Sequence, residues 1–131
     1  MRRIAITGAA ALVACGVLGM VPAAVQASSA PAPTWTKQAP AAHPTKRVSA
    51  AMAYDAATRT TVLFGGRTGG GAPLRDTWTW DGSTWTKRAP ATSPPARENA
   101  PMAYDAATGN VVMFAGYGGS DWLGDTWTWG N

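Results

Sequence analysis

The chain has 131 residues, with 11 Lys and Arg, 7 Asp and Glu, one His and one Cys. This length allows one small domain and little more. The formal net charge of +4 comes from scattered side chains, with no basic run and no recognisable basic helix. The charge pattern therefore gives no support to nucleic-acid binding.

The first thirty residues are typical of a secretory signal peptide. A positively charged start is followed by the apolar or small run Ile4 to Val21, and small residues near Ala27 and Ala30 offer cleavage sites. We therefore expect residues 1–30 to be removed and the mature chain to be secreted, with no membrane span after cleavage. A membrane anchor is the alternative, although the apolar run is at the lower limit for spanning a bilayer.

Cys15 is the only cysteine, and small residues precede it. Lipid attachment at Cys15 is thus an alternative to simple secretion, but apolar residues continue to Val21, where a lipoprotein would normally become polar. If cleavage follows Ala27 or Ala30, the mature chain has no cysteine. Packing or assembly must then stabilise it without disulfides.

An internal repeat of about fifty residues occupies the rest of the chain. Two pairs of segments match at a spacing of 50 residues: 47–66 with 97–116, and 34–47 with 84–97. The pentapeptide DTWTW also occurs twice, as residues 76–80 and 125–129, but at a spacing of 49. The second period is therefore one residue shorter than the first, and the missing residue lies between Gly116 and Asp125.

One full period predicts four short antiparallel strands. In the first period they are Ser49–Asp55, Thr60–Phe64, Asp76–Trp80 and Thr84–Lys87. Alternation places Trp78 and Trp80 on one face of the third strand, where we expect them to pack between sheets, and Asp81-Gly82 is typical of a tight turn. The second period supplies three strands between Asn99 and Trp129, and a lone strand of the fourth type is predicted at Thr34–Lys37. A four-stranded sheet repeated at a fixed period is typical of a propeller blade.

These spacings resemble the kelch repeat, for which about fifty residues is usual. The resemblance rests on an Arg before the first strand, a double glycine after the second, and Trp in the third and fourth strands. Gly65-Gly66 matches the double glycine, whereas the second period has Ala115-Gly116. The residues expected to be structural in both periods are Tyr54, Gly65, Gly66, Trp78, Trp80, Trp85, Tyr104, Gly116, Trp127 and Trp129.

The resemblance implies an all-β fold of kelch-like, galactose-oxidase-like propeller blades over residues 31–131. It places one complete blade at 49–88 and a second at 99–131 that lacks its fourth strand. Two blades cannot close a ring, since propellers have four to eight. Two hypotheses remain open: a partial propeller derived from a longer one, or a homo-oligomeric ring in which Thr34–Lys37 completes a neighbour's blade.

The loops between the second and third strands, Arg67–Arg75 and Tyr117–Gly124, differ most between the two periods. Together with the connection Arg88–Ala96 they are expected at one end of the sheets, and such loops commonly hold binding residues. The ligand-binding candidates are Arg67, Arg75, Tyr117, Asp121, Trp122, Arg47 and Arg97. Because Arg47 and Arg97 recur at equivalent positions, a structural hydrogen-bonding role is the alternative for them, and Trp122 could equally cover an exposed sheet face.

The sequence contains few side chains that could act as catalytic groups. His43 is the only histidine, and the predicted mature chain has no cysteine, which leaves no thiol nucleophile and no multi-His metal site within one chain. Secreted kelch-like proteins include copper radical oxidases, which need copper-binding His and Tyr and a Cys cross-linked to Tyr. We therefore expect no metal and no cofactor.

The leading hypothesis for function is a secreted, non-catalytic binding or scaffold module with a protein or glycan ligand. One alternative is a truncated remnant of a secreted kelch-type sugar oxidase or hydrolase. Another is a small oligomeric, lectin-like glycan binder.

Overall fold

The computed structural model describes residues 30–130. The predicted targeting segment, with Cys15 and the Ala27 cleavage site, lies outside the described residues. Contacts divide the chain into two units, 1–35 and 36–131. Of the first unit only residues 30–35 are described, and they form no strand. Within the described range no helix is long and apolar enough to cross a membrane.

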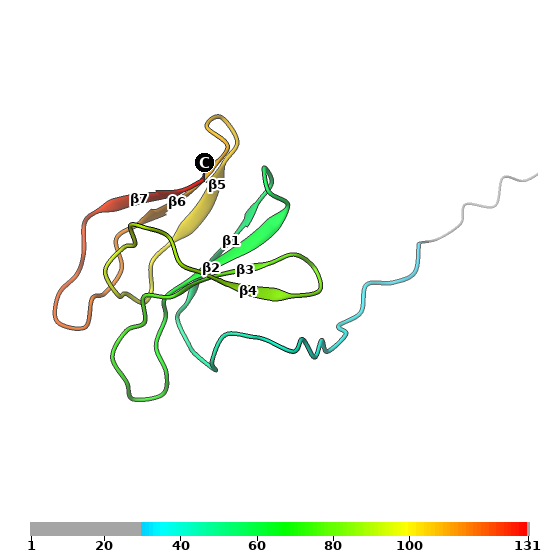
Figure 1. Ribbon diagram of the computed structural model, residues 1–131, viewed down its shortest axis with the longest axis horizontal. Helices are drawn as coiled ribbons and strands as arrows, with labels where there is room; N and C mark the ends of the chain where they lie inside the picture. The colour runs from blue at the N-terminus through cyan, green and yellow to red at the C-terminus, as the bar shows by residue number, and fades with distance from the viewer. Residues whose placement is uncertain (1–29, 131) are drawn as a thin grey trace, which may run out of the picture. The chain divides into compact units, whose positions relative to one another are not determined.

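The described residues form β-strands and no helix, which confirms the predicted all-β class (Figure 1). Both sheets are antiparallel and open, with the strand orders β1-β2-β3-β4 and β5-β6-β7. The first consists of β1 (Ala51–Asp55), β2 (Thr60–Phe64), β3 (Thr77–Trp80) and β4 (Trp85–Arg88). The second consists of β5 (Met102–Asp105), β6 (Asn110–Phe114) and β7 (Thr126–Trp129).

The strand bounds agree closely with those predicted from the sequence, and Thr60–Phe64 agrees at both ends. The segment Thr34–Lys37 differs, because the structure has no strand there and its residues are exposed. A single extended segment gains little without a partner strand to satisfy its backbone groups, and water satisfies them equally well. The fourth strand predicted at this position is therefore absent from the fold.

The β1–β2 and β5–β6 turns are each held by an aspartate at the end of the first strand. Asp55 accepts hydrogen bonds from the Ala57 and Thr58 backbone N–H groups at 3.0 and 3.3 Å, and from the Thr58 hydroxyl at 2.7 Å. Asp105 repeats the arrangement in the second sheet. Such aspartate turns fix the register of both hairpins from residues that are adjacent in sequence.

Each sheet has two chemically different faces, because side chains alternate along every strand. We call the face that contains β3 or β7 tryptophans the Trp face and the opposite one the Phe face. The Trp face consists of Met52, Tyr54, Thr61, Leu63, Trp78 and Trp80 in the first sheet, and of Met102, Tyr104, Val111, Met113, Trp127 and Trp129 in the second. The Phe face consists of Ala51, Val62, Phe64, Thr77 and Thr79 in the first sheet, and of Ala103, Val112, Phe114, Thr126 and Thr128 in the second.

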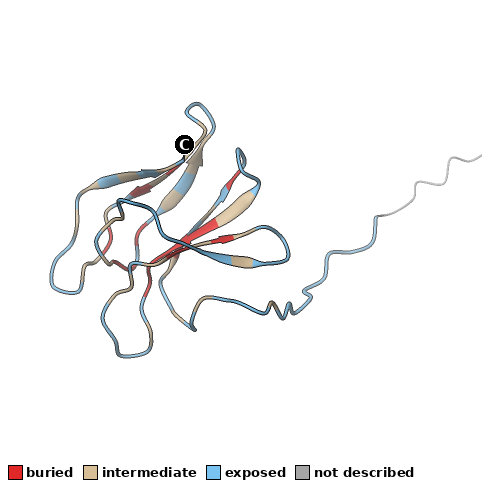
Figure 2. Ribbon diagram, viewed as in Figure 1, coloured by how far each residue is buried: buried red, intermediate tan, exposed pale blue. Residues whose placement is uncertain are grey.

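The Trp face of the second sheet packs on the Phe face of the first, with β1 against β5 and β6 (Figure 1). Ala51, Phe64, Ala100 and Met113 form the buried cluster, against which Met102 and Trp127 pack. Phe64 is 3% exposed, whereas Phe114, at the equivalent position of the second sheet, is 51% exposed. Figure 2 shows this concentration of buried residues between the sheets.

The two tryptophans at the first position of TWTW have different environments. Trp127 packs between the sheets, as expected, whereas Trp78 lies on the Trp face of the first sheet, which no second sheet covers within residues 30–130. The buried side chains of β3 are instead Thr77 and Thr79, each 4% exposed. The expectation that both pentapeptides bury their tryptophans between sheets is therefore correct for the second copy and incorrect for the first. The reason is that a face is buried only where a neighbouring sheet lies on it.

Backbone hydrogen bonds join the sheets at the end that bears the long loops. The Gly66 N–H donates to the Arg97 carbonyl at 2.9 Å, and the Arg97 N–H donates to the Leu74 carbonyl at 3.1 Å. Gly65 has a φ of +62°, and a Cβ added there would lie 2.3 Å from the Arg97 oxygen. Glycine is thus required at residue 65 for the close approach of the second sheet. The backbone conformation alone does not require it, since Ala115, the equivalent residue of the second sheet, has a φ of +57°.

Replacement of this glycine tests the close approach. We expect Gly65→Ala to lower the free energy of unfolding by about 2–4 kcal/mol, because the methyl group would force the two sheets apart. Gly70→Ala is the matched control, since Gly70 also has a positive φ of +77° but no atom within 4 Å of an added Cβ. Its cost should be about 1 kcal/mol, from backbone strain alone. Urea denaturation measures both, and equal losses would contradict the sheet–sheet contact at residue 65.

Candidate functional site

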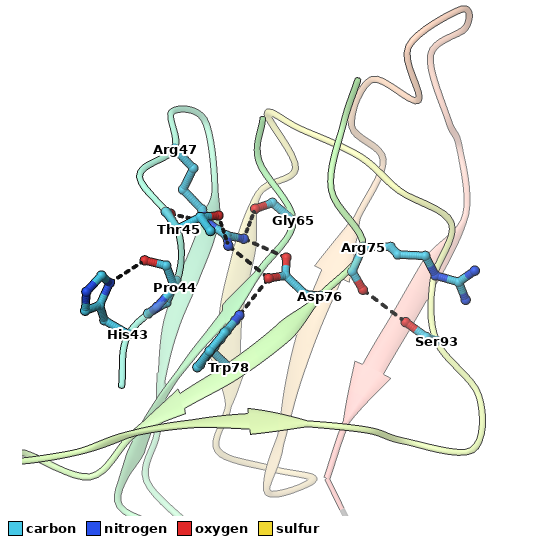
Figure 3. Close-up of polar contacts among 9 residues, drawn as sticks. All are labelled: His43, Pro44, Thr45, Arg47, Gly65, Arg75, Asp76, Trp78 and Ser93. Carbon is cyan, nitrogen blue, oxygen red and sulfur yellow. Dashed lines mark hydrogen bonds and ion pairs between the residues drawn. The ribbon is translucent and has the colours of Figure 1, made fainter. Parts of the chain in front are cut away.

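Arg47 joins three strands of the first sheet (Figure 3). Its Nη1 and Nη2 donate to the two carboxylate oxygens of Asp76 at 2.7 and 2.9 Å, and Nη1 also donates to the Gly65 carbonyl at 2.9 Å. The indole N–H of Trp78 donates to the same carboxylate at 2.7 Å. The chain before β1, the end of β2 and the start of β3 are thereby held at one point.

Arg97 makes the same set of contacts in the second sheet. Its guanidinium donates to both carboxylate oxygens of Asp125, at 2.6 and 2.8 Å, and to the Ala115 carbonyl at 2.7 Å. The Trp127 indole N–H again donates to the aspartate. The Arg97 side chain is 0% exposed and that of Arg47 is 6% exposed. Both guanidinium groups face into the fold. This favours a structural hydrogen-bonding role for Arg47 and Arg97 over ligand binding.

These contacts change the acidity of the two aspartates. Hydrogen bonds from Arg47 hold the pKa of Asp76 below its ordinary value, and the bond from Trp78 acts in the same direction. Hydrogen bonds from Arg97, and then from Trp127, hold the pKa of Asp125 well below its ordinary range. Both carboxylates therefore remain ionised in the folded protein under mildly acidic conditions.

Removal of one carboxylate tests the structural role. Asp76→Ala leaves the Arg47 guanidinium buried without its anion, and we expect it to lower the free energy of unfolding by about 3 kcal/mol. This lies at the lower end for a buried pair, because the Asp76 side chain is 21% exposed. Asp121→Ala, on an exposed loop, should cost less than about 0.5 kcal/mol. A loss of the same size in both variants would contradict the role of Asp76.

The lowered pKa values also predict a dependence of stability on acid. A carboxyl group whose pKa is lower in the folded state contributes stability above its unfolded pKa, near 3.8, and loses that contribution as the pH falls toward the folded value. We expect the unfolding free energy of the protein to fall between about pH 5 and pH 2. In Asp76→Asn and Asp125→Asn this fall should be smaller, whereas Asp121→Asn should keep it. Urea midpoints measured across this range check the prediction, and an unchanged pH slope in the first two variants would be evidence against it.

A pocket lies on the loop-bearing end, where the two sheets meet. It has a volume of about 420 Å³ and is lined by both predicted loops, with Arg67 from one and Tyr117 from the other. Glu98 also lines it, and its backbone pairs with Tyr117 through hydrogen bonds of 3.0 and 2.8 Å. Arg67 is held in the same way by Val48. The pocket wall is thus anchored by short backbone pairings on both sides.

Glu98 is the most unusual group in this pocket. It is 5% exposed, and its Oε2 atom has no hydrogen-bond partner among the described residues. The Nε atom of Arg67 lies 3.1 Å from Oε2, which is close enough for an ion pair, but its N–H is not aligned for a hydrogen bond. The sequence predictions did not include Glu98 as a site residue. Its signal was the mismatch within the repeat, where the equivalent residue of the first period is Val48.

Tyr117 and Trp122 form an aromatic pair on the second loop, in which Tyr117 is half-buried and Trp122 is exposed. Their ring centroids are 5.3 Å apart, and the Tyr117 hydroxyl donates to the Gly119 carbonyl at 2.8 Å. Trp122 is 75% exposed, and Asp121, next to it, accepts a hydrogen bond from the Ser120 hydroxyl at 2.9 Å. The structure therefore brings Arg67 and Tyr117 into the pocket, with the Trp122 ring tilted by 58° against Tyr117 and Asp121 on the same loop.

The other loop candidate, Arg75, does not line this pocket. Its side chain is exposed and projects away from the Arg47 cluster (Figure 3). His43 is also exposed, with Nδ1 2.9 Å from the Pro44 carbonyl. Over residues 30–130, no three side chains of His, Cys, Asp or Glu are grouped so as to hold a metal ion.

Comparisons with known proteins do not assign the chain to a family. No protein-family model matches it, and no curated relative matches its sequence. The geometry of the pocket and of the residues around it is therefore the basis on which a function can be proposed.

Proposed function

We propose that this chain is a secreted, non-catalytic binding module made of kelch-like propeller blades, which holds its ligand in the pocket on its long-loop face. Secretion is supported by the signal-like pattern of residues 1–30. Two features support the assignment of each sheet as a blade. The strands follow a simple up-and-down order, and the Trp face of one sheet packs on the Phe face of the other. Stacking of equivalent units in one sense is typical of repeat folds.

The buried Glu98 carboxylate, which lines the pocket beside the half-exposed Arg67, is the single observation that carries the proposal. Its Oε2 atom makes an ion pair with Arg67 but accepts no hydrogen bond, and a buried acceptor in that state costs about 1–3 kcal/mol. A ligand that shifts Arg67 and supplies a donor would recover this cost. Arg67 adds donors that are half-exposed beside it. The pocket wall therefore holds a carboxylate and a guanidinium as an ion pair, with Oε2 and Nε 3.1 Å apart.

A carbohydrate is the ligand class that these groups favour. A sugar hydroxyl can donate to Glu98 and accept from Arg67, and a sugar ring can pack on the exposed Trp122 ring beside Tyr117. An anionic ligand is disfavoured because it would approach the Glu98 carboxylate. A protein partner with a lysine side chain is the second candidate, since an ammonium group also supplies donors to a carboxylate.

A binding screen tests the proposal. The purified protein would be applied to arrays of oligosaccharides and of basic peptides, and the affinity for the best binder would be measured by calorimetry. We expect binding to an oligosaccharide, with Glu98→Gln weakening it about tenfold or more through loss of the charged acceptor. Trp122→Ala should weaken it about three- to tenfold through loss of ring stacking.

Arg75→Ala is the control, because Arg75 is on the same long-loop end but outside the pocket lining. Its affinity should equal that of the unmodified protein, and thermal denaturation should show all variants folded. Binding that is unchanged in both Glu98→Gln and Trp122→Ala would exclude this pocket. Binding to basic peptides alone, lost in Glu98→Gln, would keep the pocket and replace the carbohydrate with a protein partner.

A further inference from the structure

Two sheet faces are open within residues 30–130, one at each side of the stacked pair. On the Trp face of the first sheet, Met52 is 51% and Tyr54 is 56% exposed, whereas Leu63 at its centre is buried. On the Phe face of the second sheet, Phe114 is 51% exposed, and Thr126 and Thr128 are exposed as well. Large apolar side chains gathered on one surface of a small protein commonly mark an interaction site.

The open Phe face has the same residues as the one that is covered. Val62, Phe64, Thr77 and Thr79 of the first sheet correspond to Val112, Phe114, Thr126 and Thr128 of the second. The first set lies under the second sheet and is 1–4% exposed. The open face therefore has the composition of a surface that this same protein already buries.

The open Trp face likewise corresponds to a covered one. Met52 and Trp80 correspond to Met102 and Trp129, which line the space between the sheets. A groove of about 680 Å³ lies between Met52 and Trp80 and the segment from Lys37 to His43 of the same chain, whereas the space beside Met102 and Trp129 is only about 60 Å³. Its opposite wall is lined by Val62, Phe64 and Thr77 of the first sheet, and by Pro90, Thr92 and Pro94 of the connection between the sheets. The open groove has the position and lining that a Phe face fills elsewhere in the molecule.

We propose that the Phe face of the second sheet binds the Trp face of the first sheet in another copy of this chain. The contact continues, between copies, the interface that the chain forms internally. It is heterologous, since two different faces meet, so it can add further copies until the rotation closes a ring. This inference uses only the sheet faces and is independent of the ligand pocket.

Ala115 makes the contact between copies weaker than the internal one. Its equivalent in the first sheet is Gly65, where an added Cβ would lie 2.3 Å from the Arg97 carbonyl. In the contact between copies, the methyl group of Ala115 takes that place and the Arg47 carbonyl of the second copy is the atom that it meets. The face contact can form, but the backbone hydrogen bond equivalent to that from Gly66 to Arg97 cannot. Association should therefore be weak and concentration-dependent.

Replacement of this alanine by glycine tests the inference by a gain of affinity. Sedimentation velocity of the purified protein would measure the dissociation constant, expected in the micromolar to millimolar range. We expect Ala115→Gly to tighten association at least tenfold, since it restores the glycine found at the internal junction. A variant that stays monomeric up to about 1 mM, or that associates no better than the unmodified protein, would overturn the proposal.

Two further variants test which faces meet. Met52→Glu and Phe114→Glu each place a charge on one open face, at a residue that is 51% exposed, so the fold should tolerate both. In the Ala115→Gly background each should be monomeric by itself. An equimolar mixture of the two should form a heterodimer, because one copy retains an intact Phe face and the other an intact Trp face.

Ala106→Glu is the charge control, since Ala106 lies on the exposed β5–β6 turn outside both faces. It should associate as its parent does. Near-ultraviolet circular dichroism would establish that every variant keeps its tertiary structure. Association that survives both Met52→Glu and Phe114→Glu would overturn the proposal and would indicate another surface, such as the free edge of β7.

Discussion

The buried guanidinium of Arg97 is the interaction on which the rest of the structure depends. Its donors hold the end of β6 at Ala115 and the start of β7 at Asp125, while its backbone bonds to the loop of the first sheet. Glu98 follows it directly in sequence and lines the pocket. Because a planar guanidinium can donate to a carboxylate and a carbonyl at once, lysine could not replace it in this position. One arginine thus holds the second sheet together, joins it to the first and positions the pocket.

Much of the fold is predictable from the sequence because it is set by local signals. Aspartate turns at Asp55 and Asp105 and the alternation of apolar residues define strands from neighbouring positions. The orientation of the faces is not local. The identical TWTW segments place Trp127 between sheets and leave Trp78 on an open face, and only the position of a neighbouring sheet distinguishes them. The segment at Thr34–Lys37 shows the same limit, since a strand-like pattern does not form a strand without a partner.

The residues of the candidate site were also predictable only in part. Arg67 and Tyr117 were predictable because the two long loops differ between otherwise matching periods. Glu98 lies just before β5, in a segment that the two periods share, and the sequence predictions did not include it as a site residue. Its counterpart in the first period is the apolar Val48. Loop membership alone placed Arg75 in the site, but side-chain direction along a loop cannot be derived from composition. Differences between the two copies at single positions are therefore a better guide to this pocket than the loops as a whole.

The identity of β3 and β7 also affects how the chain folds. During folding, β2 can pair with either of two segments of identical sequence, β3 or β7, and both would fit the same register. The native choice closes the shorter loop, which costs less chain entropy, so each meander forms faster from its own residues than from those of the other. A chain held unfolded at high concentration loses this advantage, because segments from different molecules then compete with local ones. The repeat that makes the architecture simple thus also makes rapid local pairing necessary for correct folding.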